Sequence, residues 1–359
     1  MAVAPAHVDV ERAAPSTPAP VSRRRSRRVL GIVVLLAALA LMLMASLALG
    51  SRQIPVDIVI DAVDRTIRGI DVVTNDGLIV RDMRLPRTVI GLVAGLALGA
   101  AGALMQAVTR NPLADPGLLG VNAGAAFAAV IGVSAFAVEG TSGLVWFALA
   151  GAAIASVVVY TLGSVGRGGA TPVRLTLAGM ALTALLVALT SAVILSDQEA
   201  LQLYRFWVVG ALAGRDIGVV LQVAPFIAVG LVLAVAVAYL LNALALGDET
   251  ARALGTNVAT TRLITALAVT LLCGAATAAC GPIVFVGLVV PHVVRMWFGP
   301  DERWVVPASA LAGPVLMLAS DVVGRMIARP SEVQVGIMTA VLGGPAFVAL
   351  VRRSRTAHL

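Results

Sequence analysis

The sequence contains no lysine, and charged and aromatic residues are scarce. All 26 basic residues among the 359 are arginine, 13% of residues are charged, and aromatic residues make up 4%. A phosphate-binding P-loop requires a lysine that reaches the β- and γ-phosphates, so this chain cannot form one. A genomic base composition that favours arginine codons is the simpler cause of the absence. In either case, nucleotide hydrolysis would have to come from another chain.

Cysteine is almost absent as well. Cys273 and Cys280 are seven residues apart on one predicted helix, which places them about 10 Å from each other. That distance is too long for a disulfide, and the chain has no Cys/His spacing typical of a metal site. The sequence therefore predicts two packing residues, and it predicts neither a metal site nor catalytic residues.

Apolar residues are abundant: 59% of the chain is hydrophobic and its mean hydropathy is +0.98. Soluble domains carry about 25% charged residues, roughly twice the share found here, so soluble enzymes and nucleic-acid binders are excluded. The excess consists mostly of Ala, Val, Leu and Gly, and such small residues suit helices that pack closely in lipid. The composition predicts an all-α integral membrane protein.

Stretches without charge locate the predicted spans, because a charge at mid-bilayer costs at least ~2.5–3.5 kcal/mol on insertion scales. The segment Leu263–Val294 is too long for one span, and Gly281-Pro282, a helix-breaking pair, divides it. About ten transmembrane helices result, at 29–49, 88–109, 116–138, 140–166, 175–196, 217–247, 263–280, 283–298, 304–320 and 333–351.

The basic ends of the chain indicate its orientation. Residues 1–28 are predicted to be a disordered, basic cytoplasmic tail that ends in five arginines between Arg23 and Arg28. The apolar run that follows is longer than the ~7–15 residues of a secretory signal, so we interpret it as an uncleaved anchor. A twin-arginine signal and a nucleic-acid patch are alternatives that the adjacent full-length span disfavours. Ten spans return the C-terminal tail, 355–359, to the cytoplasm, in agreement with the positive-inside rule.

Spans two to five and seven to ten are predicted to be two related halves. Each half begins with a glycine-rich helix and reaches a polar break with proline, at Asn111-Pro112 and at Pro291-His292. Internal repeats are common in transporters, although glycine and proline enrichment in any membrane protein would resemble this pattern.

The predicted spans contain few groups that could power transport. Ion-coupled carriers keep ionisable groups near mid-membrane, whereas Asp321, Arg325 and His292 lie near predicted helix ends. A lining of Gly, Ala, Ser, Thr and aliphatic side chains would let a bulky solute pass without tight binding. We therefore expect energy to enter from outside the bilayer, and the solute not to be a naked cation.

Two polar segments are candidates for contact with partners. In the inner loop at 245–255, Asp248 can cap the start of a short helix and Gly255 can end it. Such a helix could dock into a partner, or it could be an ordinary connector. At the outer end of span two, Arg84 and Arg87 are either interface anchors or a docking post for acidic side chains of an external protein. Arg325 would complete a positive rim.

Several ordered motifs together resemble the permease family of ABC importers for iron–siderophores, haem and cobalamin, the FecCD-like type II importers. These motifs are Arg84-Leu85-Pro86-Arg87-Thr88, Gly102-Ala103-Leu104-Met105-Gln106, Asn111-Pro112-Leu113-Ala114-Asp115-Pro116, the inner loop above, Phe285 to His292, and Gly336-Ile337-Met338-Thr339-Ala340. The resemblance covers residues 29–354, which we treat as one permease domain.

The resemblance implies a dimer with an identical or homologous second permease subunit, two ATPase subunits below it and an extracytoplasmic solute-binding protein above it. ATP and Mg²⁺ would be bound by the ATPase and not by this chain. The coupling residues implied, in a loop at about 245–260, are Gly247, Asp248, Glu249, Arg252, Leu254 and Gly255. Arg84, Arg87 and Arg325 match docking positions, and Thr171 and Pro172 match a cytoplasmic gate. Pro172 departs from the small polar residue that the resemblance implies at that position of the gate. Asn111, Pro112, Gly281, Pro282, Pro291 and His292 are structural motif residues.

The function implied is a permease of the plasma membrane that passes a metal chelate, a ferric siderophore above all, into the cytoplasm while a partner hydrolyses ATP. A cobalamin or haem importer is the alternative within the family. An ion-coupled secondary transporter of a bulky solute is the alternative from another class. A membrane scaffold or sensor is disfavoured, because the chain has no sizeable soluble domain.

Overall fold

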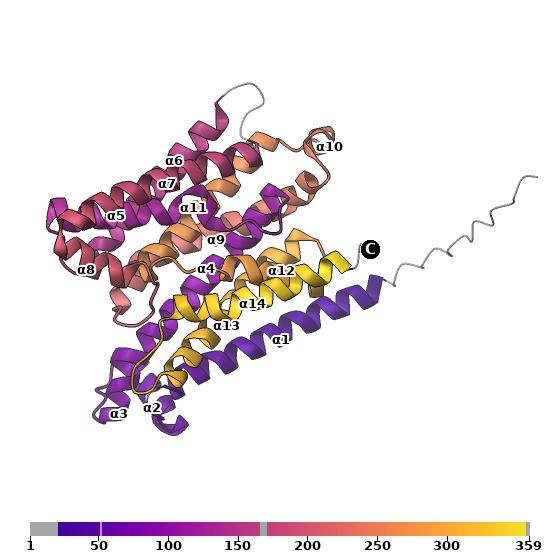
Figure 1. Ribbon diagram of the computed structural model, residues 1–359. Coiled ribbons are helices and arrows are strands. Elements are labelled where there is room, and N and C mark those ends of the chain that lie inside the picture. The colour runs from indigo at the N-terminus through magenta and orange to yellow at the C-terminus, as the bar shows by residue number, and fades with distance from the viewer. Residues whose placement is uncertain (1–20, 51, 166–170, 357–359) are drawn as a thin grey trace, which may run out of the picture.

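The computed structural model describes residues 21–50, 52–165 and 171–356, and within these ranges it is built of helices without strands (Figure 1). The first twenty residues of the predicted tail, the loop at 166–170 and residues 357–359 lie outside the described residues. The helices are α1 (Val21–Ala48), α2 (Val56–Arg68), α3 (Asn75–Ile79), the π-helical turn η1 (Val80–Arg84), α4 (Leu85–Thr109), the 3₁₀ turn η2 (Pro116–Leu119), α5 (Val121–Phe136), α6 (Thr141–Ser164), α7 (Pro172–Ser196), α8 (Gln198–Trp207), α9 (Ile217–Ala245), α10 (Asp248–Ala253), α11 (Val258–Cys280), α12 (Val286–Phe298), α13 (Glu302–Ile327) and α14 (Val335–Thr356).

Ten of these helices correspond in order to the ten predicted spans. Seven are long and apolar enough to cross a membrane, namely α1, α4 with the turns before it, α6, α7, α9, α11 and α13. The shorter apolar helices α5, α12 and the first part of α14 lie at the positions of the other three predicted spans. The all-helical, multi-span architecture is therefore confirmed. Helix α1 begins at Val21, inside the segment predicted to be a tail, so that segment is shorter than expected.

Helix α4 is the central helix of the bundle, and glycines bring α13 against it. Gly95 and Gly99 are one turn apart and lie on one face of α4. A Cβ atom on Gly99 would lie 2.1 Å from the carbonyl oxygen of Ser309, and one on Gly313 would lie 2.1 Å from that of Gly95. No side chain fits at these positions, so the two backbones pack directly, as small residues allow in membrane helices.

The other helices lie on either side of α4 (Figure 1). Helices α5, α6, α7 and α8 pack together on one side, whereas α1, α12, α13 and α14 pack together on the other. Helix α11 contacts α5 and α6 of the first group together with α4 and α9, whereas α4 itself contacts α12 and α13 of the second group and so joins the two. Because α4 of the predicted first half packs most closely on α13 of the second, the two predicted halves are not separate structural units.

The predicted break at Gly281-Pro282 is confirmed: α11 ends at Cys280 and α12 begins only at Val286. Gly281 has a φ of 78°, and a Cβ atom there would lie 2.3 Å from the carbonyl oxygen of Trp207. Glycine is therefore required both for the backbone conformation and for the close approach of the segment after α8. Cys273 and Cys280 are free and buried, as predicted for packing residues.

Candidate coupling and docking sites

The inner loop between α9 and α11 forms a single short helix, α10, with defined ends. Gly247 precedes it with a φ of 102°, and Gly255 follows with a φ of 82°. The amide of Gly255 donates to the carbonyl of Arg252 at 2.9 Å, so Gly255 ends the helix as predicted. The prediction that the Asp248 side chain caps the helix is wrong, because Gly247 occupies the capping position and Asp248 is the first helical residue.

The Asp248 carboxylate instead ties α10 to two long helices. It accepts hydrogen bonds from Arg262 of α11 at 2.9 and 3.0 Å and from Arg110, at the end of α4, at 3.1 Å. The Arg262 side chain is 6% exposed and that of Arg110 is 39% exposed. Because hydrogen bonds between charged groups are the stronger kind, Asp248 fixes α10 to the central helix of the bundle.

The rest of α10 faces outward. Ala251 is fully buried and supplies the packing contact, whereas Glu249, Arg252 and Leu254 are exposed. Leu254, which follows the helix, is 63% exposed. The helix therefore combines an internal anchor with a mixed polar and apolar outer face, and that combination suits contact with another protein.

The predicted gate residues Thr171 and Pro172 lie at the start of α7. The Thr171 hydroxyl accepts a hydrogen bond from the amide of Arg174 at 3.4 Å, and Pro172 is the first helical residue. Pro172 also lines a narrow cavity between α4, α7 and α11 that Arg262 borders. Proline fits the first turn without losing a backbone hydrogen bond. The gate itself stays a prediction, since part of its loop lies outside the described residues.

Two of the predicted structural motifs lie in a turn and inside a helix. The Asn111 side chain accepts a hydrogen bond from the amide of Leu113 at 2.9 Å, in the exposed turn with Pro112 that follows α4. Pro291 is buried inside α12, and His292 beside it is partly exposed. Neither pair contributes to a cluster of charged side chains.

Arg84, Arg87 and Arg325 lie close together where η1 meets α4 and near the end of α13, but they do not form the exposed positive rim that was predicted. They are only 5%, 9% and 2% exposed. Arg84 donates to the carbonyl oxygen of Leu47 at 2.7 Å, and Arg325 donates to that of Ser46 at 3.0 Å. The prediction of a rim is wrong because the end of α1 covers both guanidinium groups.

Two carboxylates complete this outer cluster. Asp321, fully buried, pairs with Arg87 at 2.7 Å and with Arg325 at 3.0 Å. Glu332, whose side chain is 34% exposed, pairs with Arg87 at 2.6 Å. The three arginines of the cluster, Arg84 included, outnumber its two carboxylates by one positive charge. Removing one partner of such a buried pair typically costs about 3–5 kcal/mol, so the cluster holds the outer ends of the helices together.

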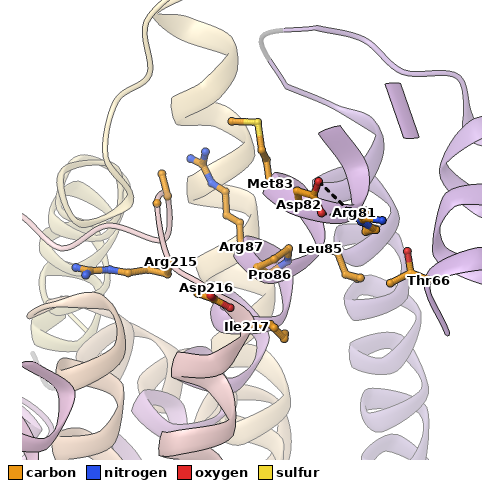
Figure 2. Close-up of a pocket in the computed structure, with 12 residues that line it drawn as sticks. Thr66, Arg81, Asp82, Met83, Leu85, Pro86, Arg87, Arg215, Asp216 and Ile217 are labelled. Carbon is orange, nitrogen blue, oxygen red and sulfur yellow. Dashed lines mark hydrogen bonds and ion pairs between the residues drawn. The ribbon is translucent and has the colours of Figure 1, made fainter. Parts of the chain in front are cut away.

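An open pocket of about 680 Å³ lies beside this cluster, on the side of the bundle that was predicted to be the outer one. Figure 2 shows Arg81 paired with Asp82 at one side of the pocket, and Arg87 and Arg215 at the other. Arg215, in the loop before α9, is partly buried, and this burial lowers the pKa of its guanidinium. Arg87 is thus the one member of the predicted docking trio that lines this opening.

A polar network near the end of α4 opposite to Arg87 was not predicted from the sequence. Gln106 of α4 donates to the carbonyl oxygen of Leu288 at 3.0 Å and accepts from Arg295 of α12. Arg295 also donates to Glu302 of α13 at 3.0 Å, and the amide of Glu302 donates to Asn242 of α9 at 2.9 Å. Gln106 is the one amide side chain in the uncharged span 88–109, and that isolated polarity was the available signal.

Asp301, in the turn before α13, is held by hydrogen bonds at the same inner surface. Arg303 donates to it at 3.0 Å and Asn242 donates at 2.9 Å. These bonds, that from Arg303 above all, lower the pKa of the Asp301 carboxyl. The inner ends of α9 and α13 are therefore joined by a charged, hydrogen-bonded turn.

Comparisons with known proteins agree with this geometry. The model of the FecCD transport family matches residues 38–353. The ferric enterobactin transport system permease protein FepD of Escherichia coli is 45% identical over 326 residues, which cover 91% of this chain and 96% of FepD. The Fe(3+)-citrate import system permease protein YfmD of Bacillus subtilis is 43% identical over 282 residues, which cover 79% of this chain and 84% of YfmD.

The fold also matches a solved structure, described as an inward-facing conformation of a proposed metal-chelate type ABC transporter. The TM-score is 0.77 at 26% sequence identity, and the match covers 89% of this chain and 98% of the other. The sequence and the fold therefore point to the same group of membrane proteins.

Proposed function

The chain belongs to the FecCD transport family, and from this premise we propose how it works as the permease subunit of a metal-chelate importer. It is a multi-pass membrane protein. Its cargo, in this proposal, is a ferric siderophore that moves into the cytoplasm. The similarity to permeases named for ferric enterobactin and ferric citrate supports an iron chelate over cobalamin.

ATP hydrolysis belongs, in this proposal, to two ATPase subunits bound at the cytoplasmic face. The chain has no lysine with which to build a P-loop, so ATP and Mg²⁺ would be held by those partners. A second permease subunit would complete the membrane part of the transporter. Helix α7 is a suitable contact for this second subunit, because only 11% of the residues in its most apolar 18-residue stretch are buried within this chain.

The observation that carries the proposed mechanism is the anchoring of α10 by Asp248. A helix with an exposed outer face, tied to α4 and α11 by three hydrogen bonds, can transmit the movement of a partner to the centre of the bundle. The spans then alternate between outward-open and inward-open states, and ATP binding shifts the balance between them.

We place the docking of the solute-binding protein at the outer pocket, with Arg87 as its contact. Arg84 and Arg325 would support this site from behind, since their guanidinium groups are covered by α1. The single excess positive charge of the cluster favours an acidic side chain on the partner. That side chain would compete with Glu332, the more exposed of the two internal carboxylates.

Uptake by the assembled transporter in proteoliposomes tests this function. The vesicles enclose ATP on the side of the ATPase subunits, and the binding protein is added on the opposite side. Under these conditions we expect a radiolabelled ferric siderophore to accumulate inside the vesicles. Hemin and cobalamin serve as matched cargoes in the same vesicles, each with a binding protein of its own specificity. Accumulation of either one in preference to the siderophore would overturn the proposed cargo, and ATP-independent accumulation would overturn the mechanism.

A further inference from the structure

The pocket of about 680 Å³ beside Arg87 has the size and the composition of a small-molecule site. Such sites have volumes of about 300–1,000 Å³ and combine mostly apolar walls with a few polar groups. The apolar side chains of this pocket are those of Met83, Leu85, Pro86, Ala213 and Ile217. One acidic side chain of a docked protein would fill only a small part of this space. The pocket therefore has room for a bulky solute as well.

Most of the acidic and basic side chains that line the pocket have partners. Arg81 pairs with Asp82 at 2.7 Å, and Arg87 pairs with the two carboxylates of the outer cluster. The Asp216 carboxylate accepts a hydrogen bond from a backbone amide of α9 at 2.8 Å and so caps that helix. Arg215 differs from them: within the described residues it forms no ion pair, and its Nε atom is buried without a hydrogen-bond acceptor.

The loop before α9 holds Arg215 on a fixed backbone. The amide of Ala211 donates to the carbonyl oxygen of Cys280 at 2.8 Å, and Leu212 is only 1% exposed. Two residues after Arg215 the chain enters α9, so both ends of this short segment are anchored. Figure 2 shows the Arg215 side chain on the opposite side of the pocket from Asp82. Because the segment is already ordered, little conformational freedom is lost when a ligand binds to it.

The unpaired charge of Arg215 favours an anion in the pocket. Arginine remains protonated at physiological pH, and a partly buried charge without a partner has lost part of its hydration. An anionic group bound there would replace the lost interactions by hydrogen bonds between charged groups, which are the stronger kind. A neutral solute would gain nothing from this charge, and a cation would be repelled.

We propose that Arg215 is a cargo contact that selects an anionic iron(III) chelate over a neutral one. This inference rests on the proposed function, in which the binding protein covers the pocket and releases its chelate there. A tris-catecholate complex of iron(III) is an anion, because its ligands carry more negative charge than the metal balances, whereas a tris-hydroxamate complex is neutral. Arg87 is less suited to hold the chelate, because Asp321 and Glu332 already balance its charge.

Equilibrium dialysis with radioactive iron tests this contact on the assembled transporter in nanodiscs, without the binding protein. The probes are ferric enterobactin, a tris-catecholate anion, and ferrichrome, a neutral tris-hydroxamate complex, and we expect the anion to bind more tightly. Arg215→Gln should weaken the binding of ferric enterobactin about 10- to 30-fold, as expected for the loss of a hydrogen bond between charged groups, and leave ferrichrome unchanged. Arg215→Lys keeps the charge and should retain most of the affinity. Arg68→Gln, which breaks an exposed pair on α2, is the matched control and should change neither.

Docking of the cargo-free binding protein, measured by surface plasmon resonance on the same variants, separates this inference from the proposed function. We expect Arg215→Gln to dock normally. Ferric enterobactin that binds no more tightly than ferrichrome, or that binds equally well to Arg215→Gln, would overturn the proposal. Weaker docking with unchanged chelate binding would also overturn it and would make Arg215 a contact of the binding protein. Chelate binding that depends on Arg215, without uptake driven by ATP, would contradict the proposed function alone.

Discussion

Replacing Asp248 by alanine tests whether α10 transmits movement through its anchor. The variant removes the hydrogen bonds to Arg262 and to Arg110 while leaving the exposed face of α10 unchanged. It also leaves the positive charge of Arg262, whose side chain is 6% exposed, without that carboxylate. We therefore expect the helix to detach from the bundle more often while the rest of the chain stays folded.

The size of the effect follows from the burial of the two partners. Hydrogen bonds to charged groups contribute about 1.5–3 kcal/mol, which applies to the buried Arg262. The pair with Arg110 contributes about 0.5 kcal/mol or less, because exposed pairs are screened by solvent. A net loss of about 2 kcal/mol shifts the equilibrium between attached and detached α10 roughly 30-fold.

Amide hydrogen exchange across residues 247–255 measures this shift, since exchange reports local opening. We expect exchange there to become about 30-fold faster, and chelate uptake per ATP hydrolysed to fall while ATPase activity persists. Asp61→Ala, which breaks an exposed pair of similar length on α2, is the control. Asp248→Arg alone should uncouple transport, and its combination with Arg262→Asp should restore part of the coupling. Unchanged exchange with unchanged coupling in Asp248→Ala would refute the reasoning.

Three further predictions follow from other parts of the structure. Gly99→Ala should lower the free energy of unfolding by about 1–3 kcal/mol through overpacking against α13, measured by thermal unfolding in detergent. Gly218→Ala is the neutral control, because a Cβ atom there would meet no atom closer than 3.7 Å. Glu332→Gln should increase the affinity for the solute-binding protein about two- to fivefold, because it releases Arg87 from an exposed pair worth about 0.4–1 kcal/mol. Weaker binding, measured by surface plasmon resonance, would contradict the proposed competition between Glu332 and the partner's acidic side chain. Hydrogen bonding lowers the pKa of the Asp301 carboxyl in the folded state. The stability that this carboxylate contributes is therefore fully present above its unfolded-state pKa of about 4, and it is lost as the pH falls through the lower pKa of the folded state. Asp301→Asn should thus be less stable than the parent chain at neutral pH, with a difference that disappears in acid.

The spans and their breaks could be predicted from the sequence because their causes are local. Absence of charge over about 20 residues identifies a span wherever it occurs, and Gly281-Pro282 interrupts a helix whatever surrounds it. The end of α10 at Gly255 was predictable for the same reason. Its start was misplaced by one residue, because the positive φ of Gly247 decides which residue caps the helix.

The side-chain partners could not be predicted, because they are far apart in the chain. Arg87 pairs with Asp321, 234 residues later, and nothing near Arg87 in the sequence indicates that its charge is buried. Gln106 meets Arg295 across 189 residues for the same reason. Local sequence shows which residues carry charge, whereas packing decides whether that charge faces a partner protein or another helix.

We propose that the membrane-embedded chain cannot drive transport by itself and receives force through α10. The most direct test is chelate accumulation in liposomes that contain the permease without its ATPase, under imposed proton and sodium gradients. We predict no uphill accumulation under any gradient, and recovery when the ATPase, ATP and the binding protein are added. Accumulation against a concentration gradient by the permease alone would contradict the account.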